Sequence, residues 1–116
     1  MLEKVFGYVS EQYGSVPEYL WVRTPDCAVF RHRSNNKWYG IVMNVPRKTL
    51  GLPGEGGIDI LNVKCTPVVR EILLSEDRAF PAYHMNKQHW ISLPLDGSLE
   101  AETIFSLIDE SYELTK

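Results

Sequence analysis

The feature that most constrains the fold is a series of three short segments rich in aromatic and β-branched residues. They span residues 19–23, 27–33 and 37–45, and Thr24-Pro25-Asp26 and Ser34-Asn35-Asn36 separate them. Segments of this length and composition, joined by short polar turns, are typical of neighbouring antiparallel strands. We therefore predict that these segments form a meander, which is the start of one antiparallel sheet.

Three amphipathic helices are predicted around these strands. Apolar residues between positions 2 and 13 recur every three or four residues, and Gly14 ends that helix. Thr66 and Pro67 provide the cap and the first position of a second helix. Asp96-Gly97-Ser98 provides the cap of the third helix. The residues predicted to be buried on the second and third helices are Val68, Val69, Ile72, Leu73, Leu99, Ile104, Leu107, Ile108 and Tyr112.

Two further strands complete the predicted sheet. Glycine and proline residues between 51 and 57 exclude regular structure, and no Gly-Lys-Ser/Thr follows them, so we interpret this segment as a plain loop. Strands are predicted over residues 58–65 and 89–93. The order helix, four strands, helix, strand, helix predicts an α+β fold of two layers, with an antiparallel sheet and helices packed on one face. The 116 residues show no internal repeat or linker, which predicts one domain over residues 1–116.

Composition places the chain among soluble globular proteins. Apolar residues make up 44% and charged residues 23% of the sequence. No apolar run approaches the length of a membrane span, and Met1-Leu2-Glu3-Lys4 lacks the features of a signal peptide, so we expect a cytoplasmic protein without membrane association. Cys27 and Cys65 lack a Cys-x-x-Cys spacing, which favours reduced, buried thiols over a disulfide or a catalytic role.

Charge is strongly segregated along the chain, although the net charge is only −3. Between residues 19 and 54, Asp26 is the only acidic residue, whereas from Asp96 onward Lys116 is the only basic one. Such segregation can give an acidic protein one basic face, and the alternative is that the basic residues only maintain solubility. The basic residues of the first segment are Arg23, Arg31, Arg33, Lys37, Arg47 and Lys48.

The segment Phe80–Trp90 concentrates polar and aromatic side chains that no hydrophobic repeat explains. Such side chains are costly to bury without partners, so they are either satisfied internally or face a ligand. Asn86 and Lys87 illustrate both possibilities, because they could lock a loop or hold an anionic ligand. His84 and His89 are five residues apart, and in neither a strand nor a helix does this spacing place two side chains where they could bind one metal ion. No motif for nucleophilic catalysis is present.

The string Tyr83-His84-Met85-Asn86-Lys87-x-His89-Trp90 resembles the signature of the MmcQ/YjbR family of small bacterial proteins. Lys37-Trp38-Tyr39, the segment 59–67 and Ser111-Tyr112 follow the family's order, so the resemblance covers roughly residues 1–115. The sequence departs from the family pattern at Thr66, where an acidic residue is usual, and at Ala82, where glycine is common. The resemblance implies a fold similar to those of the frataxin-like (CyaY-like) proteins and secretion chaperones, with a proposed double-wing role in DNA binding.

We therefore expect a non-enzymatic protein that binds DNA weakly, without sequence preference, through basic hairpins. The residues predicted to contact nucleic acid are Arg31, Arg33, Lys37, Arg47, Lys48, Lys64 and Lys87. The alternative is a scaffold that binds a small anionic ligand or a protein partner through Tyr83, His84, Asn86, Lys87 and His89. No catalytic, metal-binding or cofactor-binding residue is predicted, and we expect a monomer or a weak dimer.

Overall fold

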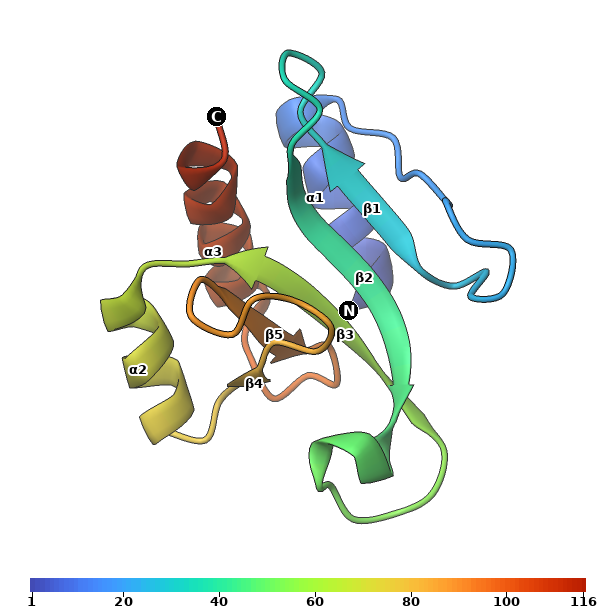
Figure 1. Ribbon diagram of the computed structural model, residues 1–116, viewed down its shortest axis with the longest axis vertical. Helices are drawn as coiled ribbons and strands as arrows, with labels where there is room; N and C mark the ends of the chain where they lie inside the picture. The colour runs from blue at the N-terminus through green and yellow to red at the C-terminus, as the bar shows by residue number, and fades with distance from the viewer.

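One antiparallel sheet of five strands organises the molecule (Figure 1). The computed structural model describes all residues from 1 to 116. In chain order the elements are α1 (Leu2–Tyr13), β1 (Ala28–Arg31), β2 (Trp38–Pro46), the 3-10 helix η1 (Arg47–Leu50), β3 (Gly57–Lys64), α2 (Pro67–Ser75), β4 (Phe80–Pro81), β5 (Trp90–Pro94) and α3 (Ala101–Leu114).

The strands are ordered β1-β2-β3-β5-β4 across the sheet. Ile41 of β2 pairs with Val29 of β1 on one side and with Asn62 of β3 on the other. Both edges of the sheet are short, because β1 has four residues and β4 only two. Short edges limit the exposure of unpaired backbone groups.

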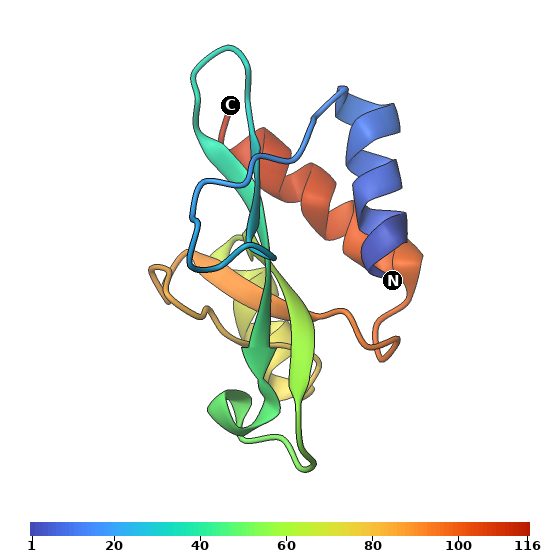
Figure 2. The same cartoon turned by 90° about the vertical axis from the view of Figure 1, so that its right-hand side faces the viewer.

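Helices α1 and α3 lie together on one face of the sheet, whereas α2 lies beside the edge formed by β5 and β4 (Figures 1 and 2). The main core fills the space between these two helices and the sheet. Its fully buried members include Val5 of α1 and Ile108 of α3, packed with Phe30, Leu61 and Leu93 of the sheet. Burial of large apolar side chains is the main favourable term in folding, so this layer fixes the arrangement of the sheet.

A β-bulge in β1 and β2 decides which way the aromatic pair Trp38-Tyr39 faces. Phe30 pairs with Gly40 but Arg31 pairs with Trp38, so Tyr39 has no partner of its own. Strict alternation would place Trp38 on the helix side. The bulge instead leaves Tyr39 in the main core and Trp38 on the opposite face. That opposite face is the open face of the sheet.

The α+β class and the antiparallel sheet are confirmed, but the predicted strand over 19–23 is wrong. This segment forms an irregular connection, and only Glu18 makes an isolated bridge to Val29. Three strands rather than four therefore precede α2, and Phe80–Pro81 supplies the additional strand after it. Residues 19–23 are of the aromatic and β-branched types that favour strands. That preference is realised only when the side chains pack against neighbouring strands, and this segment lies outside the sheet.

The helix predictions also need two corrections. Val68 and Ile72, predicted to be buried on α2, are 69% and 50% exposed. Because α2 lies beside the sheet rather than over it, only Leu73 reaches the main core as a buried residue. Asp96 does not cap α3, since its carboxylate accepts hydrogen bonds from the backbone and hydroxyl of Ser98. Thr66 does cap α2, and its hydroxyl accepts from the backbone N–H of Val69 at 3.4 Å. None of the helices combines the length and the apolar character that crossing a bilayer requires.

Candidate binding groove

The open face of the sheet carries a groove of about 500 Å³. Two irregular segments run over this face, one before β1 and one between β4 and β5, on the side opposite to α1 and α3 (Figure 2). The groove lies between them, and Ile41 and Met43 of β2 form part of its floor. We call the second segment, residues 82–89, the signature loop.

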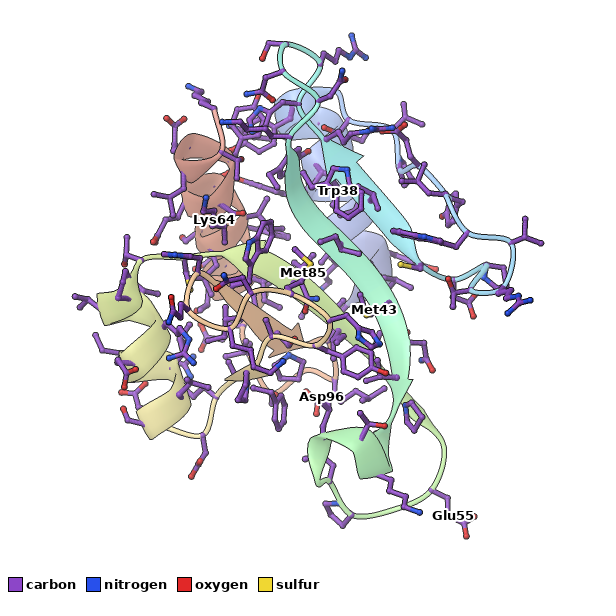
Figure 3. All side chains as sticks on the ribbon, in the orientation of Figure 1. Trp38, Met43, Glu55, Lys64, Met85 and Asp96 are labelled. Atoms are coloured by element: carbon purple, nitrogen blue, oxygen red, sulfur yellow. The ribbon has the colours of Figure 1, made fainter.

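Aromatic and thioether side chains contribute to the groove walls. Trp21 and Trp38 meet edge to face, with ring centroids 5.8 Å apart and planes at 87°. Tyr83 and Met85 of the signature loop line the opposite part of the groove. Figure 3 shows Trp38, Met85 and Met43 close together on the open face. Such walls bind flat or apolar groups, and methionine side chains adapt to different shapes.

Charged and polar groups also line the groove. Arg23 and Asp26 line the groove from the segment before β1, and neither forms an ion pair within the protein. Asn44 also lines it, but its side-chain amide donates to Asp59 Oδ1 at 2.9 Å. Arg23 and Asp26 are therefore the charged groups that remain available to orient a ligand.

A buried polar network fixes the start of the signature loop to the sheet. Asn62 and Ser92 are fully buried on β3 and β5. The Asn62 amide donates to the Tyr83 carbonyl at 2.9 Å, and the backbone N–H of Tyr83 donates to Ser92 Oγ at 3.0 Å. Ser92 Oγ in turn donates to Asn62 Oδ1 at 2.5 Å. Sequence reasoning missed both residues as parts of the site. Their only signal was a polar residue in the middle of an apolar strand.

Asn86 and Lys87 form hydrogen bonds within the signature loop itself. Asn86 Oδ1 accepts from the backbone N–H of Gln88 at 2.8 Å, which closes a local turn. Lys87 Nζ donates to the Ala82 carbonyl at 2.9 Å. His84 adopts a left-handed conformation with φ of 58°, which helps the chain to reverse direction. The geometry of Asn86 and Lys87 therefore corresponds to the loop-locking hypothesis.

The residues predicted for an anionic ligand are not all in one cavity. Tyr83 and His84 line the groove. Lys87 instead lines a separate hollow of about 240 Å³ near η1. His89 is exposed, and its carbonyl accepts from the backbone N–H of Cys65 at 2.9 Å. The groove residues Trp21, Trp38 and Met43 were not predicted as site residues, because the bulge and the irregular segment that place them are tertiary features.

The residues predicted to contact nucleic acid are distributed over the molecule. The Arg31 guanidinium pairs with the Glu18 carboxylate at 2.5 and 2.7 Å, and Arg33 donates to the Gly14 carbonyl at 3.1 Å. One end of β2 follows the turn that contains Arg33 and Lys37. The other end leads into η1, which contains Arg47 and Lys48 (Figure 1). Nine strand residues span roughly 30 Å, so these two groups do not form one patch. Lys64 ends β3 and pairs with Trp90 in the sheet register.

The two cysteines are free and buried. Burial raises the pKa of the Cys27 thiol, and burial followed by the nearby Glu110 carboxylate raises that of Cys65 to about 11. Both thiols are therefore protonated at neutral pH and poor nucleophiles. No three side chains of His, Cys, Asp or Glu gather in a way that could hold a metal ion.

The fold and the groove define a class of small α+β proteins in which helices cover one face of an antiparallel sheet and the other face carries a groove. The YjbR family model matches residues 10–114, so the chain belongs to the YjbR family. It is 46% identical over 114 residues to the uncharacterized protein YyaQ of Bacillus subtilis (strain 168), covering 98% of this chain and 97% of YyaQ. It is 37% identical over 54 residues to the uncharacterized protein YjbR of Escherichia coli (strain K12), covering 46% of each.

Solved structures show the same architecture. A crystal structure of a Pseudomonas syringae protein superposes with a TM-score of 0.94 at 38% identity, covering 98% of this chain and 97% of that one. A crystal structure of a Deinococcus radiodurans protein superposes with a TM-score of 0.73 at 24% identity, covering 98% and 77%. The second likeness concerns the fold alone. The family resemblance read from the signature is confirmed.

Proposed function

We propose that this protein is a non-enzymatic binding module that takes an apolar or aromatic ligand in the groove on the open face of the sheet. The observation that carries the proposal is the groove itself, with about 500 Å³ between largely apolar walls and with Arg23 and Asp26 unpaired in its lining. Ligand sites of proteins commonly measure about 300–1,000 Å³ and combine apolar walls with a few polar groups.

The rigidity of the signature loop supports this proposal. Asn62 and Ser92 hold the backbone of Tyr83, and Asn86 and Lys87 hold the rest of the loop. A wall that is fixed before binding loses little conformational entropy when a ligand arrives. A loop with this many internal hydrogen bonds is therefore suited to line a preformed site.

Binding of the fluorescent dye anilinonaphthalene sulfonate, an aromatic anion, tests the groove. We expect saturable binding to the folded protein and a loss of about tenfold in affinity in Met85→Glu, because a carboxylate would enter an apolar wall. The matched control is Val68→Ser, which removes an exposed apolar side chain from α2 outside the groove. Equal affinity in Met85→Glu and in Val68→Ser would show that the dye binds elsewhere.

Weak DNA binding is a second candidate, and the observation that favours it is the exposure of Lys37 and Lys48. Lys37 directly precedes β2, Lys48 lies in η1 at the other end of that strand, and neither forms an ion pair. Exposed lysines at such positions can reach the phosphates of a duplex. Anisotropy titration of a labelled duplex at several salt concentrations tests this candidate.

A further inference from the structure

The segment between α1 and β1 exposes a row of large apolar side chains. Val16, Tyr19 and Val22 are 74%, 58% and 97% exposed, and Leu20 and Trp21 are also exposed. We call these five residues the apolar strip. Exposed apolar residues that follow one another in this way mark interaction surfaces more often than ordinary protein surface.

The apolar strip and the groove are continuous. Trp21 belongs to the strip, lines the groove and packs against Trp38. A small ligand in the groove would leave Val16, Tyr19 and Val22 in water. A polypeptide would cover both, because a protein interface of standard size covers about 800 Å² on each partner.

Backbone pairing at the adjacent edge of the sheet argues against binding by strand addition. Glu18 and Val29 exchange two backbone hydrogen bonds, at 2.9 and 3.0 Å, so the outer side of β1 is already occupied there. A partner at this surface therefore binds mainly through side chains. An amphipathic helix binds in this way, because its apolar side chains, which recur at helical spacing, enter a groove while its backbone groups bond to one another.

The charge of residues 16–38, which include the apolar strip and Trp38, favours an acidic partner. Residues 16–38 contain four basic and two acidic residues and so carry +2, whereas the rest of the chain, whose total is −3, carries −5. The Glu18 carboxylate is paired with Arg31, which leaves Asp26 as the only unpaired acid of this segment. Complementary charge raises the association rate and excludes partners of the wrong sign.

We infer that the groove and the apolar strip together dock an acidic polypeptide segment whose apolar side chains recur at helical spacing. This inference rests on the binding function proposed for the groove and adds the class of its partner. The apolar anchors enter between Trp21, Trp38 and Met85, the strip covers the flank of the segment, and Arg23 and Lys37 face its carboxylates.

Two labelled synthetic peptides of about 15 residues test the inference. Both carry leucine and phenylalanine at helical spacing, with glutamate at the other positions in one peptide and lysine in the other. By fluorescence anisotropy with the full chain, we expect the acidic peptide to bind at least about tenfold more tightly than the basic one. Changing Leu20→Ser and Val22→Ser together should weaken it about tenfold. The control pair Val68→Ser and Ile72→Ser, which removes two exposed apolar side chains from α2, should leave its affinity unchanged.

The groove variant separates this inference from the proposed function. Met85→Glu should weaken both the dye and the acidic peptide, and Trp21→Ala serves the same purpose if Met85→Glu does not fold. If the dye binds the groove but neither peptide binds, the inference is wrong and the groove function stands. If neither dye nor peptide binds, both are wrong.

Three other results would also overturn the inference. Equal affinity for both peptides would remove the role of charge. Sedimentation with phosphatidylserine vesicles without peptide binding would assign the strip to a membrane surface. A dimer that dissociates in the Leu20→Ser, Val22→Ser variant would assign it to a second copy of the chain.

Discussion

His32 shows how one buried residue couples stability to pH. Its Nε2 lies 2.7 Å from the hydroxyl oxygen of Thr115, and that hydroxyl also donates to the Ser111 carbonyl at 2.7 Å. The Thr115 oxygen is therefore free to accept a hydrogen bond from a neutral imidazole. Burial lowers the pKa of His32 below its ordinary value of 6.5, and the positive charges of Lys116 and Lys37 act in the same direction.

This lowered pKa predicts a loss of stability on mild acidification. Below about pH 6.5 the unfolded chain takes up a proton at this residue and the folded protein does not, so the free energy of unfolding falls with pH. The slope can reach about 1.4 kcal/mol per pH unit. Urea unfolding between about pH 7 and pH 5.5 measures it. His32→Gln should flatten the dependence, whereas the exposed His84→Gln should not; an equal slope in both variants would refute the assignment.

Ser92 is expected to contribute more to stability than its size suggests. Ser92→Ala would leave the Asn62 side-chain oxygen and the Tyr83 backbone N–H without their buried partner. Such a loss costs about 1–3 kcal/mol in the free energy of unfolding. Urea unfolding measures the cost, with Ser106→Ala on the exposed side of α3 as the matched control. A difference of less than about 0.5 kcal/mol between the two variants would mean that water replaces the hydroxyl.

At the scale of elements, one carboxylate joins α1 to α3. Asp109 accepts hydrogen bonds from the hydroxyls of Tyr8, at 2.7 and 2.8 Å to its two oxygens, and of Tyr13, at 2.5 Å. The Tyr13 ring also stacks on Tyr112 with centroids 3.8 Å apart. Burial first, and then Asp109, raise the pKa of Tyr8 to about 12 and raise that of Tyr13 as well. Both phenols therefore keep their protons to a higher pH than an ordinary tyrosine does.

Asp109→Ala should therefore have two separable effects. We expect a loss of about 1–2 kcal/mol in the free energy of unfolding, because two half-buried hydroxyls lose their acceptor. We also expect tyrosine ionisation, followed by ultraviolet absorbance, to begin at lower pH. In the unchanged protein, stability should fall as pH rises above about 10, because the unfolded chain releases these protons first. Glu113→Ala, an exposed change on the same helix, is the control and should alter neither quantity appreciably.

The sequence predicted elements well where burial follows a regular period and poorly where tertiary contacts decide. The helix over 2–13 is confirmed at both ends, and the buried residues Ile104, Leu107 and Ile108 of α3 are confirmed. The segment 19–23 has strand propensity but no place in the sheet. Val68 and Ile72 give the exposed face of α2 the apolar character of a buried one. The sequence alone does not show that no other element covers them.

At the scale of the whole molecule, the separation of basic groups limits any DNA binding. Two groups about 30 Å apart on a protein of net charge −3 can neutralise few phosphates together. We therefore predict that the logarithm of affinity falls with the logarithm of salt concentration with a slope no steeper than about −2. The double variants Arg33→Ala, Lys37→Ala and Arg47→Ala, Lys48→Ala each remove one group. A slope near −6, or complete loss of DNA binding in only one of the two double variants, would contradict this prediction.

The sequence by itself determined the α+β class, the family, the three helices and the state of the cysteines. Those properties follow from periodicity, caps and a specific signature, which are local. Only the tertiary structure decided the binding surface, because a β-bulge turns Trp38 toward the open face, the segment before β1 brings Trp21 against it, and Asn62 and Ser92 hold the signature loop over the sheet. The signature loop supplies one wall of the groove, and residues distant in sequence supply the rest, since contact across a sheet depends on register and packing rather than on sequence spacing.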